Sequence, residues 1–275
     1  INATYKFDKH LNIRAAYGRT LARPRFREKA PYAGFEFVND FVFNGNVDLE
    51  RTLIDNYDLR MDWYLQPGEI ISISGFYKRF NNPIERVIDV RFSSEGALAF
   101  FDNVERANVY GLEFELRKML NVISPSLRNF LFISNLSLIK SEVTIPEESL
   151  EFRRALDPTA PDVRQLQGQS PFLLNLNLVY QGFSTGTTAN IYYNVFGKRL
   201  YEVSAGGTPD VFEQPRHTLN FLIDQKIGRL FSVKFSAKNI LDSDYKYTQE
   251  FKGIDFVRQQ YSKGRSFSIG ISLDR

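Results

Sequence analysis

A serine in a glycine-bounded turn is the clearest sign of catalytic chemistry in this sequence. Residues 182–186, Gly-Phe-Ser-Thr-Gly, fit the pattern of a nucleophile elbow, and Asp210 and His217 follow in the order of a hydrolase triad. An elbow needs a turn from a parallel strand into a helix, whereas this segment joins two alternating stretches as a short hairpin. His217 also lies a full strand length from Ser184. We therefore expect no catalytic residue and no enzymatic activity.

Metal-binding chemistry has equally little support in the residue types. The chain contains only two histidines, His10 and His217, and no cysteine, so it offers no His/Cys cluster. One polar stretch contains acidic residues that could bind Ca²⁺ but lack EF-hand spacing, and we interpret them as solvated charge. They are Glu147, Glu148, Glu151 and Asp157. The sequence predicts neither a metal site nor a cofactor.

The composition limits the remaining classes of function. The 275 residues carry a net charge of only +3, spread over both signs, which excludes the strongly basic surface of a nucleic-acid-binding protein. The 25 Phe and 14 Tyr favour strands. No run approaches the roughly 18 apolar residues of a membrane helix, although a membrane strand would hide its apolar residues at every second position. Because the chain opens at Ile1 without a signal peptide, we expect a mature chain or a fragment.

Alternation of apolar and polar residues is the strongest structural signal. Between Tyr57 and Leu65 one side is almost entirely apolar and the other mostly polar, a period of two that is typical of a strand. The pattern recurs and predicts about ten strands, each near the length that a tilted strand needs to cross a bilayer. These strands cover residues 11–18, 57–65, 71–78, 109–117, 130–139, 174–180, 189–195, 219–224, 231–238 and 266–273.

Short and long connections alternate between these strands. The short ones are residues 66–69, 120–128, 182–185 and 227–229, and the long polar ones, for which we expect no regular structure, are 21–52, 81–106, 142–169, 199–215 and 241–263. Short turns on one side and long loops on the other are typical of an outer-membrane barrel. Aromatic residues near strand ends, as in an interfacial girdle, agree with this. They are Tyr17, Trp63, Tyr64, Tyr77, Phe80, Tyr180 and Tyr193.

A soluble antiparallel sandwich is the main structural alternative, because it also alternates between a core face and a wet face. The strands are longer than is usual in soluble sheets, and soluble domains rarely carry five such long loops. The fold class we predict is therefore all-β, a transmembrane antiparallel β-barrel, with an extracellular binding sandwich kept as an alternative function class.

Charged residues share the polar side of the predicted strands. Against lipid each Lys or Arg would cost about 2–4 kcal/mol near the midplane, so we expect them to face a polar interior. They either line a path for solute and plug, or pair with one another and fix the barrel shape. The candidate lumen-lining residues are Asp58, Arg60, Asp62, Lys78, Glu113, Glu115, Arg117, Asn194, Lys198, Asp224, Lys234 and Lys238.

Aromatic residues also occur in the long loops. They either contact a ligand outside the membrane or pack the loops together, and the sequence leaves both interpretations open. The candidate ligand-facing aromatics are Phe35, Phe37, Phe41, Phe43, Tyr201 and Phe212.

Several short motifs, taken in order, resemble the TonB-dependent outer-membrane receptors. The motifs are Gly-Asn-Val-Asp-Leu-Glu-Arg-Thr at 45–52, Gly-Phe-Tyr-Lys-Arg-Phe-Asn-Asn-Pro-Ile-Glu at 75–85, Asn-Val-Tyr-Gly-Leu-Glu at 108–113, Leu-Gln-Gly-Gln-Ser-Pro at 166–171, Tyr-Asn-Val-Phe-Gly-Lys-Arg at 193–199, Glu-Gln-Pro-Arg at 213–216 and Lys-Asn-Ile-Leu-Asp at 238–242. Each motif alone is weak, but their shared order is specific and covers nearly the whole chain. Val47 and Arg51 stand where the family often has Pro, and the last residues, Leu-Asp-Arg at 273–275, replace its usual terminal aromatic. Either the end is missing or the folding signal differs.

The resemblance implies that residues 1–275 form the C-terminal part of a 22-stranded, plugged barrel, with the plug domain and the early strands outside this chain. It implies an outer-membrane receptor that imports a scarce solute with energy from TonB, and hence contacts with outer-membrane lipid, the plug, TonB and an unknown small-molecule, glycan or peptide ligand. A surface lipoprotein is a common partner of glycan and peptide importers, but no residue here indicates one. A passive or structural barrel of an assembly or secretion complex is the rival function.

Overall fold

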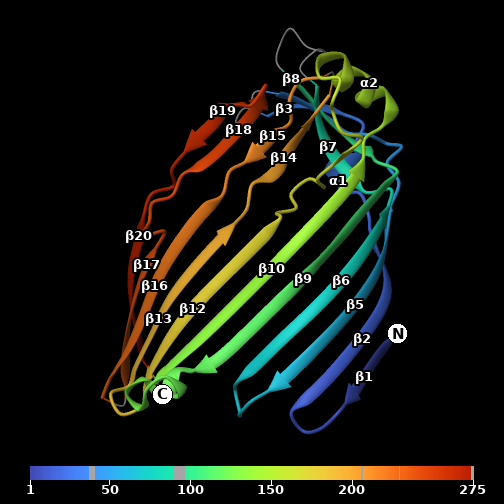
Figure 1. Ribbon diagram of the computed structural model, residues 1–275. Coiled ribbons are helices and arrows are strands. Elements are labelled where there is room, and N and C mark those ends of the chain that lie inside the picture. The colour runs from blue at the N-terminus through green and yellow to red at the C-terminus, as the bar shows by residue number, and fades with distance from the viewer. Residues whose placement is uncertain (37–40, 90–96, 206, 229, 274–275) are drawn as a thin grey trace.

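Antiparallel strands dominate the computed structural model, which describes residues 1–36, 41–89, 97–205, 207–228 and 230–273. The larger sheet forms an open, curved wall of long, tilted strands (Figure 1). Its spatial order is β1 (Asn2–Lys6), β2 (Leu11–Ala22), β5 (Thr52–Tyr64), β6 (Ile70–Asn81), β9 (Arg106–Met119), β10 (Phe130–Thr144), β12 (Phe172–Gly182), β13 (Thr187–Phe196), β16 (Arg216–Ile227), β17 (Phe231–Lys238) and β20 (Ser266–Leu273). The short β11 (Val163–Arg164) pairs with the end of β10.

The ten strands predicted from alternation are all present in this wall. Each neighbour in the wall pairs with the next in antiparallel register, as expected for a meander. Several strands run beyond the predicted bounds, and β10 extends over 15 residues. The strand β1 was not predicted, because its five residues are too few to show a period of two.

A second sheet occupies one end of the wall, and we call it the cap sheet. Its order is β19 (Ile254–Tyr261), β18 (Tyr245–Phe251), β15 (Val211–Glu213), β14 (Arg199–Ser204), β7 (Ile84–Asp89), β8 (Ala97–Asn103), β4 (Phe41–Asn44) and β3 (Ala33–Glu36). Two pairs in it, β14 with β7 and β4 with β8, are parallel. The helices α1 (Phe26–Lys29) and α2 (Glu147–Leu156) also lie in the long connections.

The expectation that the long connections lack regular structure was wrong. All five contribute strands or helices. Backbone groups pair within single connections, as in β14 with β15, and between connections, as in β14 with β7. The short connections behave as predicted and gather at the opposite end of the wall (Figure 1). They include the 3₁₀ turns η1 (Leu120–Val122) and η2 (Pro125–Leu127), and a turn at Gly68, whose φ of +84° favours glycine.

The apolar side of the wall carries no second layer of protein. Trp63 is 50% exposed and Leu59 58% exposed. A sandwich would bury these side chains between two sheets, so the sandwich fold is excluded for the described residues. Among those same residues, no helix is both long and apolar enough to cross a membrane.

Buried apolar side chains concentrate where the wall meets the cap sheet. Val104, Ala107 and Val143 form one cluster, with Phe80 and Leu166 packed against it. A second cluster lies within the cap sheet itself and comprises Phe41, Ile88 and Ala99. The hydrophobic core of the described chain is therefore small and holds the cap sheet in place on the wall.

Candidate binding surface

The wall has one mainly polar face, which we call the polar face, and register defines its members. One row crosses seven strands, each residue directly opposite the next. The row is Asp62, Ser72, Glu115, Asn135, Asn175, Asn194 and Thr218. Because side chains alternate across a strand, every second residue from this row shares its face. Asp58, Arg60, Lys78, Glu113, Arg117, Asp224, Lys234 and Lys238 meet this condition.

A compact ion-pair network lies on the polar face toward the end with the short turns. Arg60 donates from Nε to Asp62 Oδ1 at 2.7 Å and from Nη2 to Glu115 Oε2 at 2.7 Å. Ser72 donates to the same oxygen of Asp62, and Arg14 Nε lies 3.3 Å from the other oxygen. The Asp62 side chain is only 1% exposed. Two arginines balance its charge. The side chains in this part of the polar face therefore stabilise one another by ion pairing.

The remaining polar-face candidates are more loosely arranged. Lys234 lies 3.7 Å from Asp224 on the neighbouring strand, and Asn194 donates to Asn175 at 2.7 Å. Lys198 is the exception in position: it follows β13 and sits at the cap sheet, 3.4 Å from Glu250 and 3.7 Å from Asp255. The structure thus places eleven of the twelve candidates on one face of the wall and Lys198 beyond it.

The structure places the loop aromatics in different environments, some buried in the cap sheet and others partly exposed. Phe41 and Phe43 are buried in the cap sheet, at 2% and 3% exposure, and pack the loops together. The Tyr201 ring lies 4.4 Å from that of Tyr247, and Lys198 lies over the ring of Phe212 at 4.9 Å. Phe35 is on β3 and 46% exposed. Phe37 lies outside the described residues.

Buried ion pairs link the long connections to one another, and no sequence pattern indicated which residues would pair. Arg164 binds the buried carboxylate of Glu85 with two hydrogen bonds. Arg86 donates to Glu202 at 2.9 Å, and Gln167 Nε2 donates to the Tyr201 carbonyl at 2.7 Å. Arg153 on α2 lies 2.8 Å from Asp210, and Arg199 lies 2.6 Å from Glu213. These contacts join residues from three of the long connections, 81–106, 142–169 and 199–215.

A cluster of cations and aromatic rings lies where the polar face meets the cap sheet, and we call it the mouth cluster. Arg216 lies 4.1 Å above the Tyr245 ring and 5.8 Å from the Phe196 ring, and Lys263 lies 4.5 Å from Tyr245. Tyr245 stacks on Tyr261 at 4.9 Å. The Nε of Arg216 has no hydrogen-bond partner among the described residues. This arrangement can bind an anionic group beside a flat apolar surface.

A hollow of about 300 Å³ lies at the same end of the wall as the mouth cluster, beside β5 and β6. The polar-face residues Ile54 and Phe80 contribute to it, together with Leu166 from the connection between β10 and β12. Arg23 and Arg25 stand at its edge. It therefore combines apolar walls with positive charge, as the mouth cluster does. Sequence analysis missed both features. The hollow is lined by three separate connections, and the mouth cluster joins the ends of β13 and β16 to the connection at 241–263.

The serine of the elbow-like segment is in a hairpin turn. Residues 183–186 join β12 to β13, and His217 pairs with Val195 at the far end of the neighbouring strands. The Nδ1 of His217 is bonded to the hydroxyl of Tyr193 at 2.6 Å. The carboxylate of Asp210 forms an ion pair with Arg153 and not with His217. The three residues are thus far from forming a triad.

The fold and its two faces define the wall of a membrane β-barrel, and comparison with known proteins agrees. Residues 1–240 match the family described as TonB dependent receptor-like, beta-barrel. The chain belongs to this family. Its members are receptors and transporters, and membership implies an outer-membrane location. No curated protein matches the sequence.

Solved structures share the fold at low sequence identity. A mutant of the ferric enterobactin receptor PfeA from Pseudomonas aeruginosa aligns with a TM-score of 0.63 and 16% identity, over 99% of this chain and 39% of that one. The siderophore receptor PirA from Pseudomonas aeruginosa gives 0.61 and 14%, over 100% and 41%. The copper transporter OprC gives 0.68 and 13%, over 99% and 38%. The chain thus spans about two fifths of the length of these proteins.

Proposed function

We propose that this chain is the C-terminal barrel wall of an outer-membrane receptor that imports a scarce solute with energy supplied through TonB. The observation that carries the proposal is the continuous wall with one polar, ion-paired face and a folded cap sheet at one end, in a chain that belongs to the TonB-dependent receptor family. The polar face would line the lumen and contact a plug domain, and the cap sheet would lie outside the cell.

An anionic solute is the class that the cap end supports. The mouth cluster and the 300 Å³ hollow both place arginine beside apolar or aromatic surface. Guanidinium groups bind carboxylates and other planar anions with two hydrogen bonds, and aromatic rings supply contact area. Neighbouring structures are of proteins named as ferric enterobactin and siderophore receptors and as a copper transporter. Metal-containing solutes are therefore the first to test.

Transport in cells that carry the full-length protein tests the proposal. We expect accumulation of radiolabelled ferric enterobactin, or of another metal-containing solute from a panel, that disappears when TonB is deleted. The Arg216→Gln variant should weaken solute binding by about tenfold, because it removes one charge-assisted contact. Lys226→Gln, an exposed cation at the other end of β16, is the matched control.

Two results would contradict the proposal. Entry of small solutes that is unchanged without TonB would indicate a passive or structural barrel. A protein that stays monomeric and folded without detergent would not be a membrane barrel at all. Heat-modifiable migration of the detergent-purified protein is the expected result.

A further inference from the structure

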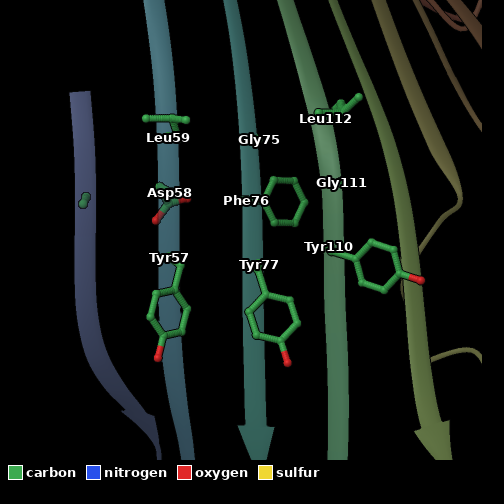
Figure 2. A pocket seen from close by; sticks show the side chains of 10 residues that line it. Tyr57, Asp58, Leu59, Gly75, Phe76, Tyr77, Tyr110, Gly111 and Leu112 are labelled. Atoms are coloured by element: carbon green, nitrogen blue, oxygen red, sulfur yellow. The ribbon is translucent and has the colours of Figure 1, made fainter. Parts of the chain in front are cut away.

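Four tyrosines form a continuous row on the outward, apolar face of the wall. Tyr17, Tyr57, Tyr77 and Tyr110 lie directly opposite one another on β2, β5, β6 and β9. The rings of Tyr17 and Tyr57 are 5.0 Å apart, and those of Tyr57 and Tyr77 are 6.0 Å apart. Figure 2 shows three of these tyrosines side by side on successive strands.

A hollow of about 600 Å³ adjoins this row. Gly75 lies directly between Leu59 and Leu112 on the neighbouring strands, and because it has no side chain the wall is shallow there (Figure 2). A Cβ on Gly75 would meet only Leu112 Cδ2, at 3.6 Å. The hollow is mainly apolar and runs from the tyrosine rings toward the middle of the wall.

Charged groups lie on the other side of the tyrosine row, toward the cap sheet. The next outward-facing row is Arg19, Asp55, Arg79, Asn108 and Glu142, each directly opposite the next. The exposed Arg106 lies two residues before Asn108 on β9 and so faces the same way. Lys140, whose side chain is 66% exposed, lies opposite Tyr110.

The two carboxylates of this region leave part of the positive charge unbalanced. Asp55 is bound by Arg19 at 2.8 and 3.1 Å, and Glu142 lies 2.7 Å from Lys140. The Nε of Arg79 has no hydrogen-bond partner among the described residues, although it is shielded from solvent. Arg79 and Arg106 stand diagonally on adjacent strands, within reach of one small anion.

The order of these layers matches the order of groups in a membrane lipid. Tyrosine rings settle at the boundary between headgroups and hydrocarbon, and arginine is tolerated on an outward face only near that boundary. The apolar hollow therefore lies at the depth of acyl chains, and the cations lie at the depth of phosphate groups.

We propose that the outward face around Gly75 is a binding site for an anionic, phosphorylated lipid of the outer leaflet, with an acyl chain in the hollow and a phosphate at Arg79 and Arg106. Charge complementarity selects this occupant over a neutral lipid, and the depth of the hollow selects a lipid over a free phosphate. The site depends on this face meeting lipid, which is part of the proposed function.

Native mass spectrometry of the full-length protein in detergent tests the site. The probe is lipid A, an acylated glucosamine disaccharide with two phosphates, compared with its dephosphorylated form and with phosphatidylcholine. We expect retention of lipid A alone. Arg79→Gln should bind it about tenfold more weakly or worse, because a charge-assisted contact is lost. Gly75→Leu, which fills the hollow, should also weaken binding.

Two matched variants act as controls. Arg128→Gln changes an exposed arginine in the turn at the far end of the wall, and Gly18→Leu adds a side chain to the polar face where a Cβ meets nothing within 4 Å. Both should bind lipid A like the parent protein, and heat-modifiable migration checks that each variant folds. Equal retention of the three lipids, or equal loss in Arg79→Gln and Arg128→Gln, would overturn the proposal. A protein that folds as a barrel yet retains no lipid A refutes this inference alone, whereas one that folds without detergent refutes the proposed function.

Discussion

Glu85 and Asp62 are buried carboxylates in different parts of the molecule, and arginine neutralises both. The side chain of each is 1% exposed. A buried carboxylate is tolerated only with a paired charge and further hydrogen bonds. Glu85 has Arg164, and Asp62 has Arg60, Arg14 and Ser72. Removing either carboxylate should therefore have a larger effect than removing an exposed one.

The Glu85→Ala variant should destabilise the cap sheet. It leaves Arg164, whose side chain is 9% exposed, without its partner, and breaking such a buried pair costs about 3–5 kcal/mol. We expect residues 84–89 and 163–167 to become sensitive to protease added outside cells. Glu147→Ala, at an exposed position on α2, should leave the digestion pattern unchanged. Equal patterns for both variants would contradict a role for the pair.

The Asp62→Asn variant should destabilise the wall by about 1–3 kcal/mol, because it keeps the shape of the side chain but leaves Arg60 and Arg14 without their shared anion. The measurement is the midpoint of denaturant-induced unfolding from lipid vesicles. Asp58→Asn, four residues earlier on the same face of β5 and exposed, is the control and should shift the midpoint little.

The phenol of Tyr247 should resist deprotonation. Burial raises its pKa well above the ordinary value, and a hydrogen bond with Tyr261 and the nearby charge of Glu213 add to the effect. The unfolded chain would lose this proton near pH 10 (roughly the free phenol value), so the stabilising contribution is complete below that pH and is lost as pH rises further. In an alkaline absorbance titration, Tyr247→Phe should remove the last tyrosinate component, while Tyr32→Phe, at an exposed ring, should retain it.

Glycines of the wall differ in how much space surrounds them, which gives a prediction for whole strands. A Cβ on Gly111 would collide with the Leu138 carbonyl and lie 3.0 Å from the Phe76 ring. Gly111→Ala should therefore push β9 away from β10 and reduce the yield of folded, heat-modifiable protein. Gly75→Ala on the neighbouring strand makes only an ordinary contact and should fold normally. Similar yields for the two variants would contradict this packing.

The strands of the wall could be predicted from the sequence because alternation is a local signal. The segment 57–65 reveals its two faces without any knowledge of its neighbours, and β5 was found for that reason. The cap sheet could not be found this way. Its strands are short, and the pairing of β7 with β14 joins distant residues in parallel. Phe41 and Phe43 were therefore left open between ligand contact and packing.

The candidate binding residues show the same division. The alternation of side chains along each strand was enough to assign Arg60 and Glu115 to one face. Their direct hydrogen bond, however, depends on the register of three strands. Arg14 was omitted although its charge and its place on the polar side of the strand at 11–18 are the signals that identified Arg60. Ser72 has no distinguishing residue type, and Arg216 lies before the predicted strand at 219–224. Register and loop pairing are the information that the sequence did not supply.

On the scale of the whole molecule, the cap sheet should behave as a folded layer. Its backbone groups are paired across connections and its core includes Ile88 and Ala99. Hydrogen–deuterium exchange should therefore show slow exchange in β7 and β14, comparable with that of the wall. The helix α2, which has no buried residue, should exchange faster. Fast exchange throughout the connections would contradict a folded cap.

The parallel pairing of β7 with β14 also constrains the order of assembly. The contact between Arg86 and Glu202 spans 116 residues, so these two segments meet only after the hairpins between them have closed the intervening chain. A hairpin within one connection, such as β7 with β8, can form as soon as that connection is present, whereas pairing between connections needs both segments in place. The pairs between connections should therefore form last. Surface epitopes made from several connections should appear later than the protease-resistant wall.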